Sequence, residues 1–148
     1  MSSESEFISP AGTINAGSTH VYKFVSDIRN FSRFIPEETV KNWVADADSC
    51  SFEINPVGSV SVKVTERNPD SLVKFEGVAL HNTGFRIWVQ MKEAEPSFTK
   101  FRIVLRADLN PFYKMMASKA ITGFLVKLVE EIEKVEGLEE LISDTQSP

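Results

Sequence analysis

Hydrophobic and polar residues alternate along most of the middle of the chain. Between Val40 and Asp108 the alternation has a period of two, and turn-forming residues such as Asn68-Pro69-Asp70 interrupt it at short intervals. A period of two is typical of strands that are covered on one face only. The pattern predicts six strands with short links, which form an antiparallel sheet. They are expected at 40–47, 50–57, 58–67, 71–80, 84–95 and 98–108.

The alternation predicts a sheet with one apolar face and one charged face. The apolar positions in the three clearest strands are Val60, Val62, Val64, Phe85, Ile87, Val89, Met91, Phe101, Ile103 and Leu105. Mostly lysine, arginine, serine and threonine occupy the positions between them, with Trp88 and Val104 as apolar exceptions. Such a sheet needs another element to cover its apolar face.

Two short helices are predicted before these strands. A first strand over 7–15 contains Pro10, which restricts it to a sheet edge or a bulge. Ser18 or Thr19 can cap the first helix, and the second can open at Asp27 or Asn30 and end at Pro36.

The last predicted element is a long helix that starts in the segment ADLNPFYKMM. Asn110 is a favourable N-cap, and Pro111 suits the first helical position. The helix can run to about Glu136, before Gly137, which makes it about 35–40 Å long at 1.5 Å per residue. One stripe of it is expected to pack on the sheet, and consists of Tyr113, Ala117, Ala120, Ile121, Phe124, Leu128, Ile132 and Val135.

Length and composition favour a single globular domain. The chain has 148 residues, of which 42% are hydrophobic and 25% are charged. We expect one domain over 1–148, with disordered ends at 1–6 and 143–148. The net charge of −5 argues against a nucleic-acid partner, which prefers a basic face.

The sequence favours a cytoplasmic location. Cys50 is the single cysteine, so no intrachain disulfide can form. The first residues, MSSESEF, have neither the basic nor the apolar region of a signal peptide. No apolar run approaches the ~20 residues that span a bilayer, so we expect no stable membrane insertion.

The order of these elements, with three segments, resembles the START-like or SRPBCC superfamily. The segments are TINAGSTHVYKFVSDIRNFSRFIP, NWVADADSCSFEI and ADLNPFYKMMASKAITGFLVKLV, and the resembling part runs from Phe7 to Val129. Within the superfamily, the chain looks similar to small single-domain bacterial members of unassigned function. Proline usually precedes the first helix in this superfamily, whereas Gly17 stands there in this chain.

The resemblance implies an α+β, helix-grip fold like that of birch-pollen allergens and polyketide cyclases. An antiparallel curved sheet of six to seven strands would wrap around the long C-terminal helix, with two short helices after the first strand. The resemblance also implies an apolar ligand cavity between the sheet and that helix. Its expected lining is Trp43, Val62, Phe75, Phe85, Ile87, Phe101, Ile103, Phe112, Met116, Ala120 and Phe124, with Lys114 and His81 as candidate polar contacts.

The start of the long helix borders the cavity mouth in this superfamily. The helical wheel places Phe112, Met115 and Met116 off the predicted core stripe. We therefore expect them to form a flexible apolar rim against the two short helices.

Catalytic and metal chemistry are not indicated. The apolar positions of the strands contain no titratable group, and an acid–base site needs several that converge. The residues His20, His81 and Cys50 lack any metal-site spacing, and we expect Cys50 to be an inert thiol. We predict no catalytic residue, no metal and no cofactor.

The charged face of the sheet can also serve as a contact surface. Trp88 is expected to point outward between cations, in cation–π contacts or in contact with a protein partner. The basic residues nearby are expected to be solvated and balanced by acidic neighbours, and are Arg86, Lys100, Arg102 and Arg106.

The leading functional hypothesis is a non-catalytic binder or carrier of a small hydrophobic or amphipathic molecule. It rests on the resemblance and on the apolar inner face. The same fold supports other functions, so two alternatives remain. One is an enzyme of the polyketide cyclase or aromatase type. The other is a protein-interaction module with a filled interior, which would bind its partner through the convex face of the sheet.

Overall fold

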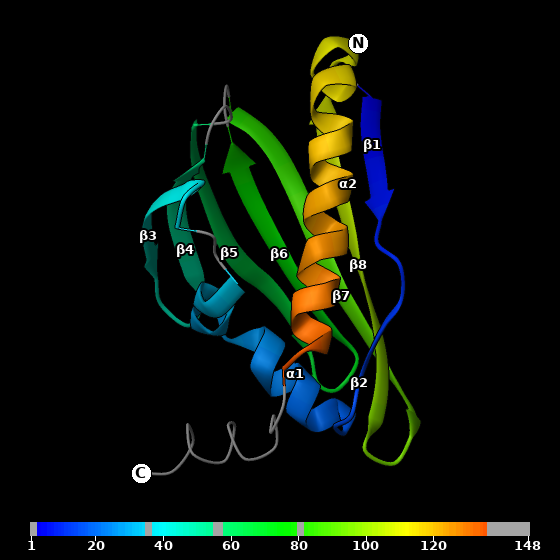
Figure 1. Cartoon of the computed structure of the whole chain (residues 1–148). Coiled ribbons are helices and arrows are strands. Elements are labelled where there is room, and N and C mark those ends of the chain that lie inside the picture. The colour runs from blue at the N-terminus through cyan, green and yellow to red at the C-terminus, as the bar shows by residue number, and fades with distance from the viewer. Residues whose placement is uncertain (1–2, 35–36, 55–57, 80–81, 136–148) are drawn as a thin grey trace.

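The computed structural model describes residues 3–34, 37–54, 58–79 and 82–135. In this part of the chain an open antiparallel sheet of eight strands faces one long helix (Figure 1). The strands are β1 (Ser3–Ile8), β2 (Gly12–Ile14), β3 (Val40–Ala45), β4 (Ser49–Ile54), β5 (Gly58–Asn68), β6 (Leu72–Ala79), β7 (Thr83–Glu95) and β8 (Phe98–Leu109). The helices are α1 (Ser18–Ser26), the 3₁₀ helix η1 (Ile28–Phe34) and α2 (Pro111–Glu133). This arrangement confirms the predicted α+β, helix-grip fold.

The sheet has the strand order β1-β8-β7-β6-β5-β4-β3, and β2 also pairs with β8. All six strands predicted from the alternation are present, as β3 to β8, and their neighbours in the sheet are antiparallel. The predicted first strand is divided in two, because Pro10 lies between β1 and β2. This division explains why the described sheet has more strands than the six to seven expected.

Residues 3–6 were predicted to be disordered, and the structure shows that this prediction was wrong for them. They form the start of β1, which pairs with β8 from Ser3 opposite Leu109 onward. The polar sequence of β1 suits the charged outer face. Glu6 accepts a hydrogen bond from Arg106 at 2.6 Å, and Glu4 pairs with Arg86. Strand pairing and these ion pairs order a segment that lacks a hydrophobic pattern.

Helix α1 starts one residue earlier than the predicted caps. Its N-cap is Gly17, which has no side chain to accept a hydrogen bond. The carboxylate of Glu93 on β7 accepts from the backbone N–H of Ser18 at 2.8 Å instead. Ser18 and Thr19 are therefore helical residues rather than caps, and a carboxylate distant in sequence satisfies the helix start.

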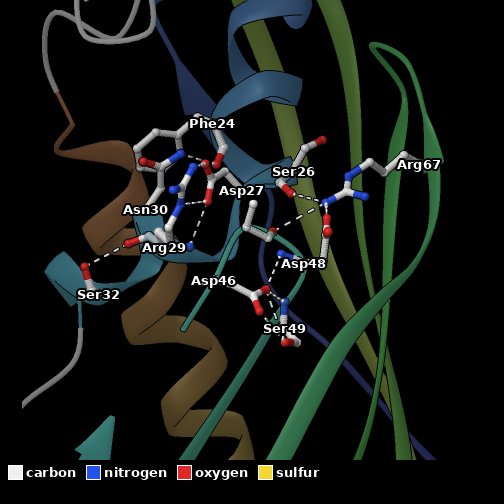
Figure 2. Close-up of polar contacts among 11 residues, drawn as sticks. Phe24, Ser26, Asp27, Arg29, Asn30, Ser32, Asp46, Asp48, Ser49 and Arg67 are labelled. Atoms are coloured by element: carbon white, nitrogen blue, oxygen red, sulfur yellow. Dashed lines mark hydrogen bonds and ion pairs between the residues drawn. The ribbon is translucent and has the colours of Figure 1, made fainter. Parts of the chain in front are cut away.

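A polar network fixes the junction of α1 and η1 to the turn between β3 and β4 (Figure 2). Asp27, as predicted, opens η1: its carboxylate accepts from the backbone N–H of Arg29 at 3.0 Å and from the guanidinium at 2.6 and 2.9 Å. Arg67 of β5 donates to the carbonyl of Ser26 at 2.8 Å and to Asp48 at 2.7 Å. The network holds η1, and hence its phenylalanines, over the inner face of the sheet.

Helix α2 begins as the sequence predicts. Pro111 is its first residue, and the side chain of Asn110 accepts from the backbone N–H of Tyr113 at 2.9 Å. The helix ends at Glu133 rather than near Glu136, and Gly137 lies outside the described residues. It contacts β2, β8 and β1, so it lies toward one side of the sheet (Figure 1).

The buried stripe of α2 differs from the predicted stripe by most of a quarter turn. The fully buried residues are Leu125, Val129 and Ile132, of which Ile132 belongs to the predicted stripe. Four other members of that stripe are partly buried against the core, namely Tyr113, Ile121, Leu128 and Val135, whereas Ala120 and Phe124 are exposed. Apolar residues surround much of this helix, so the helical wheel allows more than one apolar stripe. The position of α2 beside β2 selects the stripe that is buried.

Candidate functional site

The apolar inner face of the sheet is closed at one end. There the second half of α2 lies beside β2 and β8, and side chains of the helix and of the inner face are almost fully buried. Val73, Ile103 and Ile132 are each 0% exposed, and Leu125 is 1% exposed. This end is an ordinary close-packed core.

The same face is open at its other end. Several apolar side chains that the strand register places on the inner face remain partly exposed: Trp43, Phe52, Ile54, Val62, Val64, Phe85 and Ile87. Close-packed inner-face residues would be fully buried, so water-sized space lies above these seven. We identify this open half of the inner face as the candidate ligand site.

The first half of α2 does not close this space. From Pro111 to Phe124 no residue of the helix is fully buried, and Tyr113 and Ile121 are partly buried against the core. The helix is held at the β2 edge farther along, where Glu133 accepts a hydrogen bond from the backbone N–H of Thr13 at 2.9 Å. At about 100° per residue, Phe124 lies on the opposite flank from Glu133, toward the side on which β6 to β3 extend. Phe124 is 50% exposed and borders the open half.

Aromatic rings from η1 mark the boundary between the two halves. Phe31 lies 6.2 Å from the ring of Phe75 on β6, in an edge-on arrangement, and Phe34 lies 6.1 Å from Phe31. On β3 and β4, Trp43 and Phe52 are 5.7 Å apart. The site is therefore walled by aromatic rings, which supply broad apolar surface and few polar groups.

Among the described residues of the sheet, Cys50 is the only titratable one at an inner-face position of the open half. Burial, with a smaller effect from the nearby Asp46 carboxylate, raises the pKa of the Cys50 thiol to about 11. The thiol is therefore neutral at physiological pH and a poor nucleophile. Among the described residues, no cluster of histidine, cysteine or acidic side chains suits a metal ion. The arrangement can hold an apolar molecule, and it offers no visible acid–base pair.

The residues predicted to line a cavity are distributed over several environments. Trp43, Val62, Phe85 and Ile87 lie together in the open half. Phe75, Phe101 and Ile103 are buried in the closed half. Ala120 and Lys114 are exposed on α2, and His81 lies outside the described residues.

Three residues of the open half were absent from the predicted lining, although Val64 had been assigned to the apolar face. Phe52, Ile54 and Val64 share the inner face with Val62, as the pairing of β4 and β5 shows. Their alternation with serine, glutamate and lysine was visible in the sequence, so the same period-two argument could have included them.

The predicted rim of Phe112 and Met116 does not lie against the two short helices. α2 starts at the end of the molecule opposite α1, and its last turns are the ones near α1 (Figure 1). Phe112 is 63% exposed and Met116 is 58% exposed. At 100° per residue both point away from the buried stripe of Leu125, Val129 and Ile132.

The outer face of the sheet has the charge pattern that was expected. Trp88 lies between two cations, with Lys74 5.5 Å and Arg106 5.4 Å from its ring, which confirms the predicted cation–π contacts. Glu4 and Glu6 balance Arg86 and Arg106.

A broad hollow of about 760 Å³ also crosses this outer face. Most of its lining side chains point away from the inner face, and they mix both signs of charge, as in Lys63, Glu76, Arg86 and Asp108, with small residues. Its lining mixes these charged residues with apolar ones, including Val62 and Phe85 of the open half, and does not carry one sign of charge. The more uniformly apolar inner face is therefore the stronger candidate.

No family model and no curated protein sequence matches the chain. Solved structures match its fold over nearly the whole length. Norcoclaurine synthase from Thalictrum flavum, a point mutant in complex with a transition state analogue, has a TM-score of 0.70 at 8% identity and covers 99% of both chains. A START superfamily protein from Mycobacterium smegmatis has a TM-score of 0.62 at 12% identity, over 92% of this chain and 98% of its own. The chain has a START-like fold.

A third solved structure extends this similarity to another bacterial protein. A conserved protein from Geobacillus kaustophilus has a TM-score of 0.61 at 11% identity and covers 97% of both chains. At such low identities the similarity concerns the fold, and a fold hosts many functions. No helix among the described residues of this START-like chain is long and apolar enough to span a membrane.

Proposed function

We propose that this protein is a non-catalytic binder or carrier of a small hydrophobic or amphipathic molecule. The observation that carries the proposal is the open half of the inner face, where apolar side chains at the edge of the core point inward yet are only partly buried. Burial of apolar surface stabilises a complex by roughly 25 cal/mol per Å², so a ligand that fills this space gains free energy that the empty protein lacks. Ligand sites of this kind are mainly apolar, with few polar groups.

The lining favours a ligand whose buried part is uncharged. Trp43, Phe52 and Phe85 offer ring surfaces, and the thiol of Cys50 is neutral at physiological pH because burial raises its pKa to about 11. A charged group at this position would lose its hydration without an opposite charge to replace it. We expect any polar head group to remain at the mouth, near the exposed first half of α2.

The ligands of a protein with the same fold support a small molecule as the ligand of this one. Norcoclaurine synthase from Thalictrum flavum has been solved in complex with dopamine and hydroxybenzaldehyde, with a TM-score of 0.66 and 10% identity to this chain. Both molecules are small and aromatic. They suggest that a small aromatic compound is a suitable first probe for this protein.

Two measurements test the proposal. Native mass spectrometry of the purified protein should detect a bound small molecule, and a fluorescent apolar probe such as N-phenyl-1-naphthylamine should bind to the ligand-free protein. Val62→Trp places a bulky ring in the open half and should abolish probe binding. Val44→Trp is the matched control, because Val44 is 67% exposed on the outer face of the sheet. This variant should bind the probe normally. Equal binding by both variants, or no binding by the unaltered protein, would contradict the proposal.

A further inference from the structure

The exposed side of the first half of α2 carries an unusual group of side chains. Phe112, Met115, Met116 and Lys119 fall within an arc of about 100° on the helix, and we call these four residues the α2 patch. Phe112, Met115 and Met116 are 63%, 77% and 58% exposed. Three large apolar side chains this exposed, within five residues, exceed the scattered apolar residues of an ordinary surface.

The charge around the patch is opposite to that of the whole chain. Between Asn110 and Val129 the sequence has three lysines, at positions 114, 119 and 127, and no acidic residue, although the net charge of the chain is −5. Lys127 pairs with Glu131 at 3.6 Å. For Lys114 and Lys119, which are exposed, no salt bridge is found with any carboxylate in the described part of the chain. The patch thus combines three apolar side chains with one lysine, Lys119, that is available to an anionic partner. Lys114 lies about 150° from the centre of the patch around the helix, in the direction of Ile132.

We propose that the α2 patch docks this protein reversibly on an anionic lipid bilayer. Apolar side chains that enter the headgroup region, together with lysines that contact lipid phosphates, are the features of helices that bind at a membrane surface. The long lysine stems can lie along the apolar side chains while the ammonium groups reach the phosphates. A protein partner fits less well, because lysine is depleted at protein–protein interfaces.

The rest of the molecule determines the orientation of docking. The chain without this segment is more acidic than the whole, so an anionic surface repels it and attracts only the lysine-bearing start of α2. The four residues of the α2 patch are themselves exposed, so docking there disturbs no buried side chain. The inference rests on the patch alone and holds whether or not the inner face carries a ligand.

Vesicle co-sedimentation of the full chain tests the inference. The protein should bind vesicles of phosphatidylcholine mixed with phosphatidylglycerol, and binding should weaken with added salt and on vesicles of phosphatidylcholine alone. Met115→Asp should weaken binding at least about tenfold, because a methionine side chain that enters the bilayer on docking is replaced by a charge. Lys119→Gln, within the patch, should weaken it about fivefold, and Lys114→Gln, on the other side of the helix, should weaken it less.

Matched controls separate docking from general effects. Val44→Asp changes an equally exposed apolar residue on the outer face of the sheet, and Lys92→Gln removes an exposed lysine of β7; neither should alter binding. Circular dichroism should show that all variants remain folded. The inference is overturned if anionic vesicles do not bind the protein, or if Val44→Asp weakens binding as much as Met115→Asp. It is also overturned if the protein dimerises without lipid and Met115→Asp abolishes the dimer, because the patch is then a protein interface.

Discussion

Trp43 and Trp88 lie on opposite faces of the same sheet. Trp43 is on the inner face, where its ring is 5.7 Å from that of Phe52, and Trp88 is on the outer face between Lys74 and Arg106. The chain has no other tryptophan. Each indole therefore reports on one face.

The first prediction uses this separation. In Trp88→Phe, the remaining fluorescence of Trp43 should change in intensity and wavelength when an apolar ligand enters the open half. In Trp43→Phe, the fluorescence of Trp88 should stay unchanged under the same titration, because no ligand reaches the outer face. A change in the fluorescence of Trp88 alone would place the ligand on the outer face of the sheet and contradict the prediction.

The second prediction concerns the rotation of α2. Leu125 is 1% exposed and its neighbour Phe124 is 50% exposed. Leu125→Ala should lower the free energy of unfolding by about 2–5 kcal/mol, because it leaves a cavity in the closed half. Phe124→Ala should lower it by less than about 1 kcal/mol, although it removes more atoms. Urea denaturation of both variants measures the difference, and a reversed order would mean that the other stripe of α2 is buried.

The third prediction compares two glycines. No atom lies within 4 Å of a Cβ built on Gly123, so nothing in the packing requires glycine at this position of α2. Gly123→Ala should stabilise the protein by about 0.5–1 kcal/mol. A Cβ on Gly77 would lie 2.3 Å from Phe85 Cζ and 2.7 Å from the carbonyl oxygen of Ser61. Gly77→Ala should therefore destabilise the protein by about 1–3 kcal/mol. Thermal melts of the two variants should shift in opposite directions.

The fourth prediction concerns acid. The hydrogen bonds from the Arg29 guanidinium hold the pKa of Asp27 below its ordinary value of 3.8. This contribution to stability is complete above the ordinary pKa and is lost as the pH falls through the lower pKa of the folded state. The Asp27→Asn variant should thus have a modestly lower free energy of unfolding than the unaltered protein at neutral pH. The two free energies of unfolding should converge below about pH 4. Asp108→Asn, at an exposed carboxylate, is the control for the loss of a charge.

The fifth prediction concerns the single thiol. Because burial raises the pKa of Cys50 to about 11, Cys50 should react with a disulfide reagent at pH 8 at least roughly tenfold more slowly than a free cysteine. The rate should continue to rise up to pH 10, and a bound ligand should slow it further, since Cys50 shares the inner face with Val62. Rapid labelling at neutral pH would show that the thiol is exposed and ionised.

Most of the fold could be predicted from local sequence patterns. The alternation of β5, β7 and β8 specifies which face is buried, because a one-residue shift would expose every valine and phenylalanine on it. Asn110-Pro111 specifies the start of α2 equally well. These signals are local, so they do not depend on how the elements meet.

The candidate site was harder to predict because it depends on where α2 lies. Phe124 and Leu125 are adjacent and both apolar, and only the contact of the helix with β2 decides that Leu125 is buried. The same displacement toward β2 leaves Trp43 and Phe85 partly uncovered. A helical wheel contains no information on this displacement.

The pairing of β1 with β8 determines when the sheet can be completed during synthesis. Ser3 pairs with Leu109, so β1 must wait for β8, which is synthesised about a hundred residues later. The hairpins from β3 to β8 can form in order as they emerge, since each strand pairs with its neighbour in sequence. Until β8 appears, β1 remains a short acidic strand, whose charges discourage premature pairing with another chain.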